Sequence, residues 1–296
     1  MSKYKTKLLI FLFKSFACLP LPVIHFIGSL LGIVIYKLFK KPARVLRNNL
    51  RMSGVWGNSV EYRKILKNNI KESGKAILET FAVWFKPEKK LLQLVKQVDG
   101  WEAVLAALKR GKGVIFLTPH LGCFEITSLY YGSRHPFTVL YRGPKQHWLH
   151  PIVLVGRQRT NITLAPANSH GVKQLLQALK RGEAIGILPD QIPAEGEGEW
   201  APLLGRPAYT MTLASKLANK TDAAVFMAFG ERLSGGLGYH IHITALEHGA
   251  IAKPDLLNNE IEKQIKQCPA QYLWSYPRHK VRRASRHKLI SSTPKS

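Results

Sequence analysis

His120 and Glu125 are the two residues of the sequence whose types and spacing most favour catalysis. His120 follows a short apolar segment, 113–118, that predicts a buried strand, and Glu125 lies where a helix is expected to begin. A carboxylate that folds back onto an imidazole fixes the tautomer of the ring and stabilises the imidazolium form. His120 would then act as a general base with Glu125 as its partner. The alternative is an isolated histidine beside a surface glutamate.

Short apolar strands that alternate with helices must position these two residues. The pattern predicts strands at 113–118, 137–141, 162–164, 184–188, 223–229 and 239–244. It predicts helices at 60–85, 101–111, 171–182 and 208–218. An irregular loop rich in proline, glycine and glutamate follows the strand at 184–188. This alternation is typical of a three-layer αβα domain with a mostly parallel or mixed central sheet, which binds ligands at its strand ends.

The amino-terminal part of the chain has the composition of a membrane-associated segment. Residues 15–36 are almost entirely apolar, and a bilayer-spanning helix needs about 20 such residues. Pro20 and Pro22 interrupt a straight helix, and basic residues flank both ends, so the positive-inside rule gives no orientation. A spanning anchor, a helical pair that enters one leaflet and a buried core helix are all consistent with this pattern. We expect a membrane anchor or interfacial helices in 1–50 and a catalytic domain in 51–296.

The net charge indicates a polyanionic partner. The chain has 44 Lys and Arg against 18 Asp and Glu, a formal charge of +26, which suits nucleic acid, anionic lipid or an acidic protein or substrate. The basic residues of 37–51 follow one another without an intervening acid and suit anionic headgroups. Three widely spaced cysteines form no disulfide framework, which favours a reducing, cytoplasm-facing location. The basic tail is expected to fray from about residue 278.

Several familiar catalytic motifs are missing from the sequence. It has no GxSxG, GxxxxGK, GxGxxG or HExxH motif, which argues against α/β-hydrolases, P-loop NTPases, Rossmann dehydrogenases and zincin proteases. His240 and His242 share one face of a predicted strand, but only Glu247 or His248 lies near enough in the sequence to complete a metal site. We expect no metal site there, and none in the acidic loop that contains Glu195, Glu197 and Glu199.

The segment His120–Glu125, HLGCFE, resembles the HX4(D/E) motif of the glycerolipid acyltransferase superfamily. Most closely, it is similar to the corresponding box of the bacterial lipid A biosynthesis (late) acyltransferases. Further boxes of that family follow in order and at similar distances, namely Tyr141-Arg142, Gly156–Asn161, Leu179–Glu183, Pro189–Gln191, Leu204–Ala208 and Pro269–Ser275. The resemblance covers nearly the whole chain. Cys123 and Phe124 depart from it, because many members carry Asn and Trp there.

The resemblance implies transfer of a fatty acyl chain from acyl-carrier-protein to a hydroxyl of a lipid A precursor. It places this reaction on the cytoplasmic face of the bacterial inner membrane. A thioester is already activated, so neither a cofactor nor an acyl-enzyme is required, and Cys123 is not expected to act as a nucleophile. The expected partners are the acidic acyl-carrier-protein, anionic inner-membrane lipid and the lipid A precursor glycolipid, but not nucleic acid.

The resemblance also implies roles for individual catalytic residues. His120 and Glu125 would form the general-base pair. Arg157 aligns with a functionally important arginine of the family and is the leading candidate to stabilise the oxyanion of the reaction.

Three further residues are implied to bind substrate. Arg142 and Arg159 are alternatives to Arg157 at the oxyanion, and any of the three could instead hold an acceptor phosphate through a bidentate contact. Asp190 could bind sugar hydroxyls of the acceptor or anchor one of the arginines.

Two other functions compete with this assignment. A lysophospholipid acyltransferase of the lysophosphatidic acid type typically carries aspartate as the motif acid and a Pro-Glu-Gly-Thr box, whereas this chain has Glu125 and Pro189-Asp190-Gln191. A basic nucleic-acid-binding protein would explain the charge, but neither the apolar amino terminus nor the ordered boxes.

Overall fold

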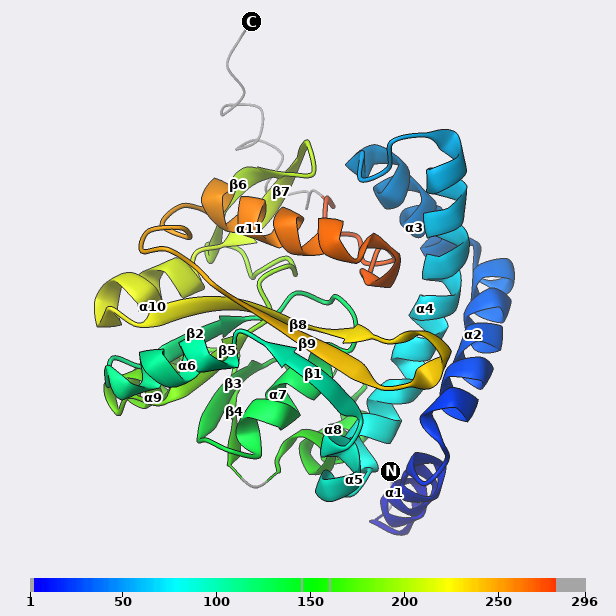
Figure 1. Cartoon of the computed structure of the whole chain (residues 1–296), viewed down its shortest axis with the longest axis horizontal. Helices are drawn as coiled ribbons and strands as arrows, with labels where there is room; N and C mark the ends of the chain where they lie inside the picture. Colours follow the sequence, from blue (N-terminus) through cyan, green and yellow to red (C-terminus); the bar gives the residue numbers. More distant parts are fainter. Residues whose placement is uncertain (1–2, 145, 160, 281–296) are drawn as a thin grey trace, which may run out of the picture.

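A seven-stranded mixed sheet forms the centre of the protein (Figure 1). The computed structural model describes residues 3–144, 146–159 and 161–280. Across the sheet the strands are β1 (Val95–Asp99), β9 (Tyr239–Ala245), β8 (Ala224–Arg232), β2 (Val114–Leu117), β5 (Ala184–Ile187), β3 (Phe137–Tyr141) and β4 (Ile162–Pro166). The β8–β9 pair is antiparallel and every other neighbouring pair is parallel. The central strands therefore share one carboxyl edge.

Helices cover both faces of this sheet, because side chains of each buried strand alternate between two apolar clusters. On β2, Val114 and Phe116 join the cluster that includes α6 (Trp101–Lys109) and α7 (Phe124–Gly132). Ile115 and Leu117 join the opposite cluster, which includes α9 (Ser169–Lys180), α10 (Leu213–Thr221) and α11 (Pro254–Gln267). The predicted three-layer αβα architecture with a mixed sheet is confirmed.

The predicted helix at 208–218 is wrong in its first part. Strand β7 (Arg206–Met211) pairs with β6 (Gly198–Leu203) in a separate antiparallel hairpin, and helix α10 begins only at Leu213. The hairpin turn is Leu204-Gly205, and both residues have positive φ, as the favoured two-residue hairpin turns require. β6 lies in the segment that was expected to be an irregular loop. The two strands are short and mix apolar residues with Pro, Gly and charged residues, so no period-2 pattern predicted them.

The amino terminus forms four consecutive helices, α1 (Lys3–Ala17), α2 (Leu21–Leu38), α3 (Lys40–Ser53) and α4 (Ser59–Phe85). The predicted interruption at Pro20 and Pro22 is confirmed, because α1 ends at Ala17 and α2 begins at Leu21. Pro20 is the N-cap of α2 and Pro22 lies in its first turn, where proline is tolerated. Within the described part of the chain, α2 is the helix that is long and apolar enough to cross a membrane.

Helix α2 packs along α4, and three glycines allow the two backbones to approach closely (Figure 1). A Cβ atom on Gly32 would lie 2.1 Å from the carbonyl oxygen of Ile70, and one on Gly74 would lie 2.0 Å from the carbonyl oxygen of Gly28. Side chains at these positions would force the helices apart. The middle of α2 is therefore fitted to the surface of α4 rather than free of the rest of the structure.

Two short helices and three 3₁₀ turns complete the described structure. They are α5 (Glu88–Leu92), α8 (His150–Arg157) and three 3₁₀ turns, η1 (His147–Leu149), η2 (Ser234–Gly236) and η3 (Pro269–Gln271). The expected fraying from about residue 278 does not begin there, because Arg278 is buried and donates to the carbonyl of Tyr209 and the hydroxyl of Thr210. The rest of that predicted basic tail, 281–296, lies outside the described residues.

Candidate active site

His120 lies at the carboxyl edge of the sheet, three residues beyond the end of β2. The chain leaves the sheet at Thr118, whose amide still donates to the carbonyl of Ile187 on β5 at 3.0 Å. Gly122 then turns the backbone with a φ of +60°, and α7 begins at Phe124. The Phe124 ring lies against the imidazole, with 4.7 Å between ring centroids. This strand–turn–helix geometry is the one that the sequence predicted for His120.

Asp190 is the carboxylate that contacts the His120 imidazole. One oxygen of Asp190 lies 2.8 Å from Nδ1 of His120, and the other accepts from the backbone amide of His120 at 2.9 Å. Asp190 is 3% exposed and follows β5, the parallel neighbour of β2. Parallel neighbours end at the same edge, so residues 70 positions apart meet there.

The ionisation of Asp190 determines the tautomer of His120. Burial raises the pKa of the Asp190 carboxyl, but its contacts with His120 and the charge of Arg278 outweigh burial and hold that pKa below its ordinary value. The ionised carboxylate can only accept, so Nδ1 of His120 donates to it, and in the neutral ring Nε2 then presents its lone pair. The side-chain amide nitrogen of Gln191 lies 3.0 Å from Nε2 of His120, so a hydrogen-bond donor can reach this nitrogen.

The predicted contact between Glu125 and the imidazole is wrong. Glu125 instead accepts from Nε of Arg157 at 3.0 Å and 3.2 Å, and Nη2 of Arg157 contacts it as well. Glu125 lies in the first turn of α7 and Arg157 in the last turn of α8. Both helices pack on α4, and the carboxylate meets the guanidinium rather than His120. The guanidinium also lies over the rings of Trp84 and Tyr141, 5.4 Å and 5.8 Å from their centroids.

A cavity of about 560 Å³ joins these groups. His120, Arg157 and Gln191 line it, together with Arg142 and the exposed side chain of Lys216. Its apolar lining consists of Leu140, Ala167, Val172, Leu188, Ile192, Pro193, Met211 and Leu213. The volume and mixed lining suit a ligand with an apolar chain and a polar, anionic portion. The sequence analysis missed Lys216, because it is a single lysine on the predicted helix 208–218.

The other two predicted arginines occupy different places. Arg142 lies between the main cavity and a neighbouring cavity of about 330 Å³, and it lines both. Arg159 does not line the main cavity, and its guanidinium donates to the backbone carbonyl of Trp84 at the end of α4. His120, Arg157 and Arg142 thus line one cavity, while Asp190 and Glu125 lie behind its wall and contact His120 and Arg157. Arg159 is left outside the lining.

Cys123 has no properties of a nucleophile. Its side chain is 3% exposed, and burial raises the pKa of the thiol well above its ordinary value. The thiol is therefore protonated at neutral pH and shielded from the cavity.

Among the described residues, one group of three side chains could hold a metal ion. Asp99 joins His240 and His242, and their ligand atoms lie within 4.8 Å of one another. The expectation of no metal site rested on nearby residues in the sequence, whereas Asp99 reaches the histidines across the β1–β9 pair. Both imidazoles already contact carboxylates, His240 with Asp99 at 2.7 Å and His242 with Glu231 at 2.9 Å.

Comparison with known proteins identifies the same family that the sequence motifs indicated. A model of the bacterial lipid A biosynthesis acyltransferase family matches residues 1–281. The chain belongs to this family. Membership supports acyl transfer in lipid A biosynthesis and confirms the resemblance inferred from HLGCFE and the boxes that follow it.

The alignments with known relatives span most of this chain. A lipid A biosynthesis palmitoleoyltransferase of Escherichia coli K12 is 26% identical over 269 residues, which are 89% of this chain and 87% of the relative. A lipid A biosynthesis lauroyltransferase of the same organism is 26% identical over 273 residues, with the same coverage. A lipid A biosynthesis acyltransferase of Haemophilus influenzae is 27% identical over 285 residues, which are 92% of this chain and 88% of the relative.

The contact between His120 and Asp190 predicts the effect of removing the charge of Asp190. We expect Asp190→Asn to lower kcat for acyl transfer by roughly 100- to 10,000-fold, because an amide no longer selects the Nδ1–H tautomer or stabilises the imidazolium. Steady-state kinetics of the folded variant measure this. The matched control is Asp222→Asn, because Asp222 is exposed and pairs only weakly with Arg110 at 3.7 Å. Wild-type kcat in Asp190→Asn would show that the reaction does not depend on the contact between Asp190 and His120.

Proposed function

We propose that this acyltransferase moves a fatty acyl chain from acyl-carrier-protein to a hydroxyl of a lipid A precursor, with His120 as the general base. The observation that carries the proposal is the His120–Asp190 pair, which leaves Nε2 of His120 facing a cavity that a cationic arginine also lines. The family membership of the chain supplies the reaction class and the pathway.

The proposed reaction begins when the acceptor hydroxyl replaces Gln191 at Nε2 of His120. The imidazole takes the hydroxyl proton as the oxygen attacks the thioester carbonyl, and Asp190 stabilises the resulting imidazolium. The tetrahedral intermediate collapses by breaking the carbon–sulfur bond, and the departing thiolate takes the proton from the imidazolium. An ester and a free thiol leave, and His120 returns to its neutral form. The thioester is already activated, so the proposal requires no cofactor.

Arg157 is our candidate for stabilising the oxyanion of that intermediate. Burial lowers the pKa of the guanidinium, but the paired Glu125 carboxylate outweighs it and raises that pKa, so the cation persists at the cavity wall. A preorganised donor of this kind commonly contributes about 3–4 kcal/mol to catalysis. We therefore propose that Glu125 acts by fixing Arg157, and not as the direct partner of His120. Arg142 is left to bind the anionic part of a substrate.

The proposal predicts that His120→Ala abolishes acyl transfer. No other described group that lines the cavity presents an imidazole, so we expect turnover to fall at least about 100-fold. The measurement is mass spectrometry of the acylated product formed by purified, folded enzyme. Cys123→Ser is the control, because the buried thiol has no role in the reaction and this variant should retain its activity. A folded His120→Ala enzyme with near-wild-type turnover would falsify the mechanism.

We propose acyl-carrier-protein as the donor because the surface of the chain is strongly basic and the carrier is acidic. A net charge of +26 attracts an acidic protein over distances that depend on ionic strength. The same charge suits the anionic headgroups beside α3 and the anionic glycolipid acceptor.

This choice of donor predicts a steep salt dependence. We expect kcat/KM for acyl-carrier-protein to fall roughly tenfold between about 50 and about 500 mM salt, because counterions screen the encounter. An acyl-pantetheine donor, which lacks the acidic carrier, is the control and should show little change. Equal use of acyl-CoA, together with kcat/KM that is independent of salt, would contradict the assignment of the donor.

For the membrane, we propose that α1 and α2 enter one leaflet from the cytoplasmic face of the inner membrane, without spanning it. Apolar side chains exposed on the outer faces of these helices are Leu8, Phe11, Leu12, Val23, Phe26, Ile27, Leu30, Val34 and Leu38. The inner face of α2 packs on α4 beside Gly74, and the Glu72–Lys75 ion pair lies next to this contact. A spanning α2 would carry that ion pair towards the bilayer centre, where charge is costly.

A single-leaflet position predicts that both ends of α2 face the same side. We expect Lys14→Cys, in the last turn of α1, and Lys40→Cys, at the start of α3, to react with an impermeant maleimide in inverted inner-membrane vesicles, whose cytoplasmic face is outward. Each is made in a Cys18→Ser/Cys268→Ser background, because both of these thiols are at least partly exposed. The buried Cys123 is an internal control that should stay unlabelled. Labelling of one end only, until the vesicles are permeabilised, would indicate a spanning helix.

A further inference from the structure

The backbone of the turn that carries His120, residues 120–123, is bound from two sides. The amide of Leu273 donates to the carbonyl of His120 at 3.1 Å, and the amide of Gly122 donates to the carbonyl of Gln271 at 3.1 Å. From the other side, the amide of Cys123 donates to the carbonyl of Gly230 on β8 at 2.7 Å. The turn is therefore held between the end of β8 and the segment 271–273.

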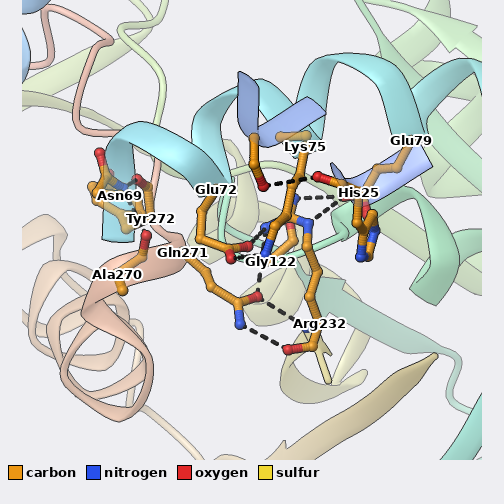
Figure 2. Close-up of polar contacts among 12 residues, drawn as sticks. His25, Asn69, Glu72, Lys75, Glu79, Gly122, Arg232, Ala270, Gln271 and Tyr272 are labelled. Carbon is orange, nitrogen blue, oxygen red and sulfur yellow. Dashed lines mark hydrogen bonds and ion pairs between the residues drawn. The ribbon is translucent and has the colours of Figure 1, made fainter. Parts of the chain in front are cut away.

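A further polar group of the turn, the carbonyl of Gly122, is bound by a buried arginine. Nη2 of Arg232 donates to this oxygen at 2.8 Å (Figure 2). Gln271 fixes Arg232 in turn, because its side chain accepts from the amide of Arg232 at 2.9 Å and donates to the carbonyl of Arg232 at 3.0 Å. A Cβ on Gly122 would lie 2.0 Å from the carbonyl oxygen of Gly230, so the turn tolerates no displacing side chain there.

The charge of Arg232 is balanced by carboxylates of α4. Nε of Arg232 donates to Glu79 at 2.6 Å, and Nη1 contacts Glu72 at 3.4 Å. Burial raises the pKa of Glu79, but the Arg232 charge and the hydrogen bonds from His25 and Arg232 outweigh it and lower that pKa to about 2. Both members of the pair are thus charged in the interior, with Glu79 1% and Arg232 4% exposed.

Helix α2 joins the same network through one side chain. Nε2 of His25 lies 3.1 Å from Glu79, and the hydroxyl of Tyr239 donates to the same carboxylate at 3.2 Å. Figure 2 shows His25, Glu79, Arg232 and Gly122 as a continuous set of contacts. The helix with the exposed apolar face is therefore linked to the His120 turn through two buried side chains.

We infer that Arg232 is a positioning residue for His120, and that α2 is part of the assembly that holds it. A buried ion pair is weak evidence for stability, because desolvation offsets most of the attraction between its charges. In this pair, however, the Arg232 guanidinium also donates a hydrogen bond to the carbonyl of Gly122, in the turn that carries His120. A displacement of about 1 Å at a reacting group can cost roughly 100-fold in rate. The inference rests on the proposed role of His120.

The inference predicts a change in kcat without a change in substrate binding. Arg232 does not line the described cavity, so the KM for either substrate should stay within about twofold. We expect kcat of the charge-balanced double variant Arg232→Gln/Glu79→Gln to fall roughly 10- to 100-fold. Arg232→Lys should recover part of this loss, because an ammonium retains the charge but cannot reach Glu79 and Gly122 with the same fork of donors.

The control is a buried polar side chain that contacts neither the turn nor a residue that binds the turn. Ser215 is 6% exposed, and its hydroxyl donates to the carbonyl of Ile251. Ser215→Ala should lower the melting temperature while leaving kcat of the folded enzyme within about twofold. A kcat loss in the Arg232 variants that merely follows the folded fraction, as in this control, would overturn the inference.

The outcomes also separate this inference from the proposed function. An active His120→Ala enzyme would overturn the role of His120 and this inference with it. An inactive His120→Ala enzyme beside folded Arg232 variants of wild-type kcat would overturn the positioning role alone. If the double variant fails to fold, Arg232→Lys decides the question, since unchanged kcat in that variant removes the need for the guanidinium fork.

Discussion

The strand order of the central sheet brings His120 and Asp190 together, and the hydrogen bond between them follows from it. It exists because β2 and β5 are parallel neighbours, and their carboxyl ends deliver the two side chains to one edge. The same edge receives Arg157 from α8, and the cavity forms between these groups. The position of the His120 imidazole therefore depends on the strand order of the sheet and on the helices that pack around it.

Acidic residues are scarce in this chain, and the buried ones have specific partners. Among the described residues, the buried acids are Glu79, Glu125 and Asp190. Each contacts a cation or an imidazole, namely Arg232, Arg157 and His120 respectively. The excess positive charge therefore remains outside these pairs, on surfaces that face lipid, carrier and glycolipid in the proposed function. Internal acids organise the site, and external bases suit its anionic partners.

Much of the architecture followed from periodicity, and the failures have a common cause. The apolar strands β2, β3, β5 and β8 were predicted because a buried parallel strand is a continuous apolar run. The hairpin of β6 and β7 was missed, because its stability comes from cross-strand pairing and not from a periodic pattern. The sequence likewise did not predict Asp99 as a neighbour of His240, because the two residues meet only across the β1–β9 pair.

The sequence by itself determined the strand–helix alternation, the apolar amino terminus and the position of His120 after a strand, because each depends on local composition and spacing. Together with the ordered boxes, these also indicated the family. Only the tertiary structure decided that Asp190 and not Glu125 contacts His120, and that Arg232 binds the carbonyl of Gly122. These contacts join residues 70 and 110 positions apart. Such pairs are set by the order of strands in the sheet and by helix packing, which no local pattern encodes.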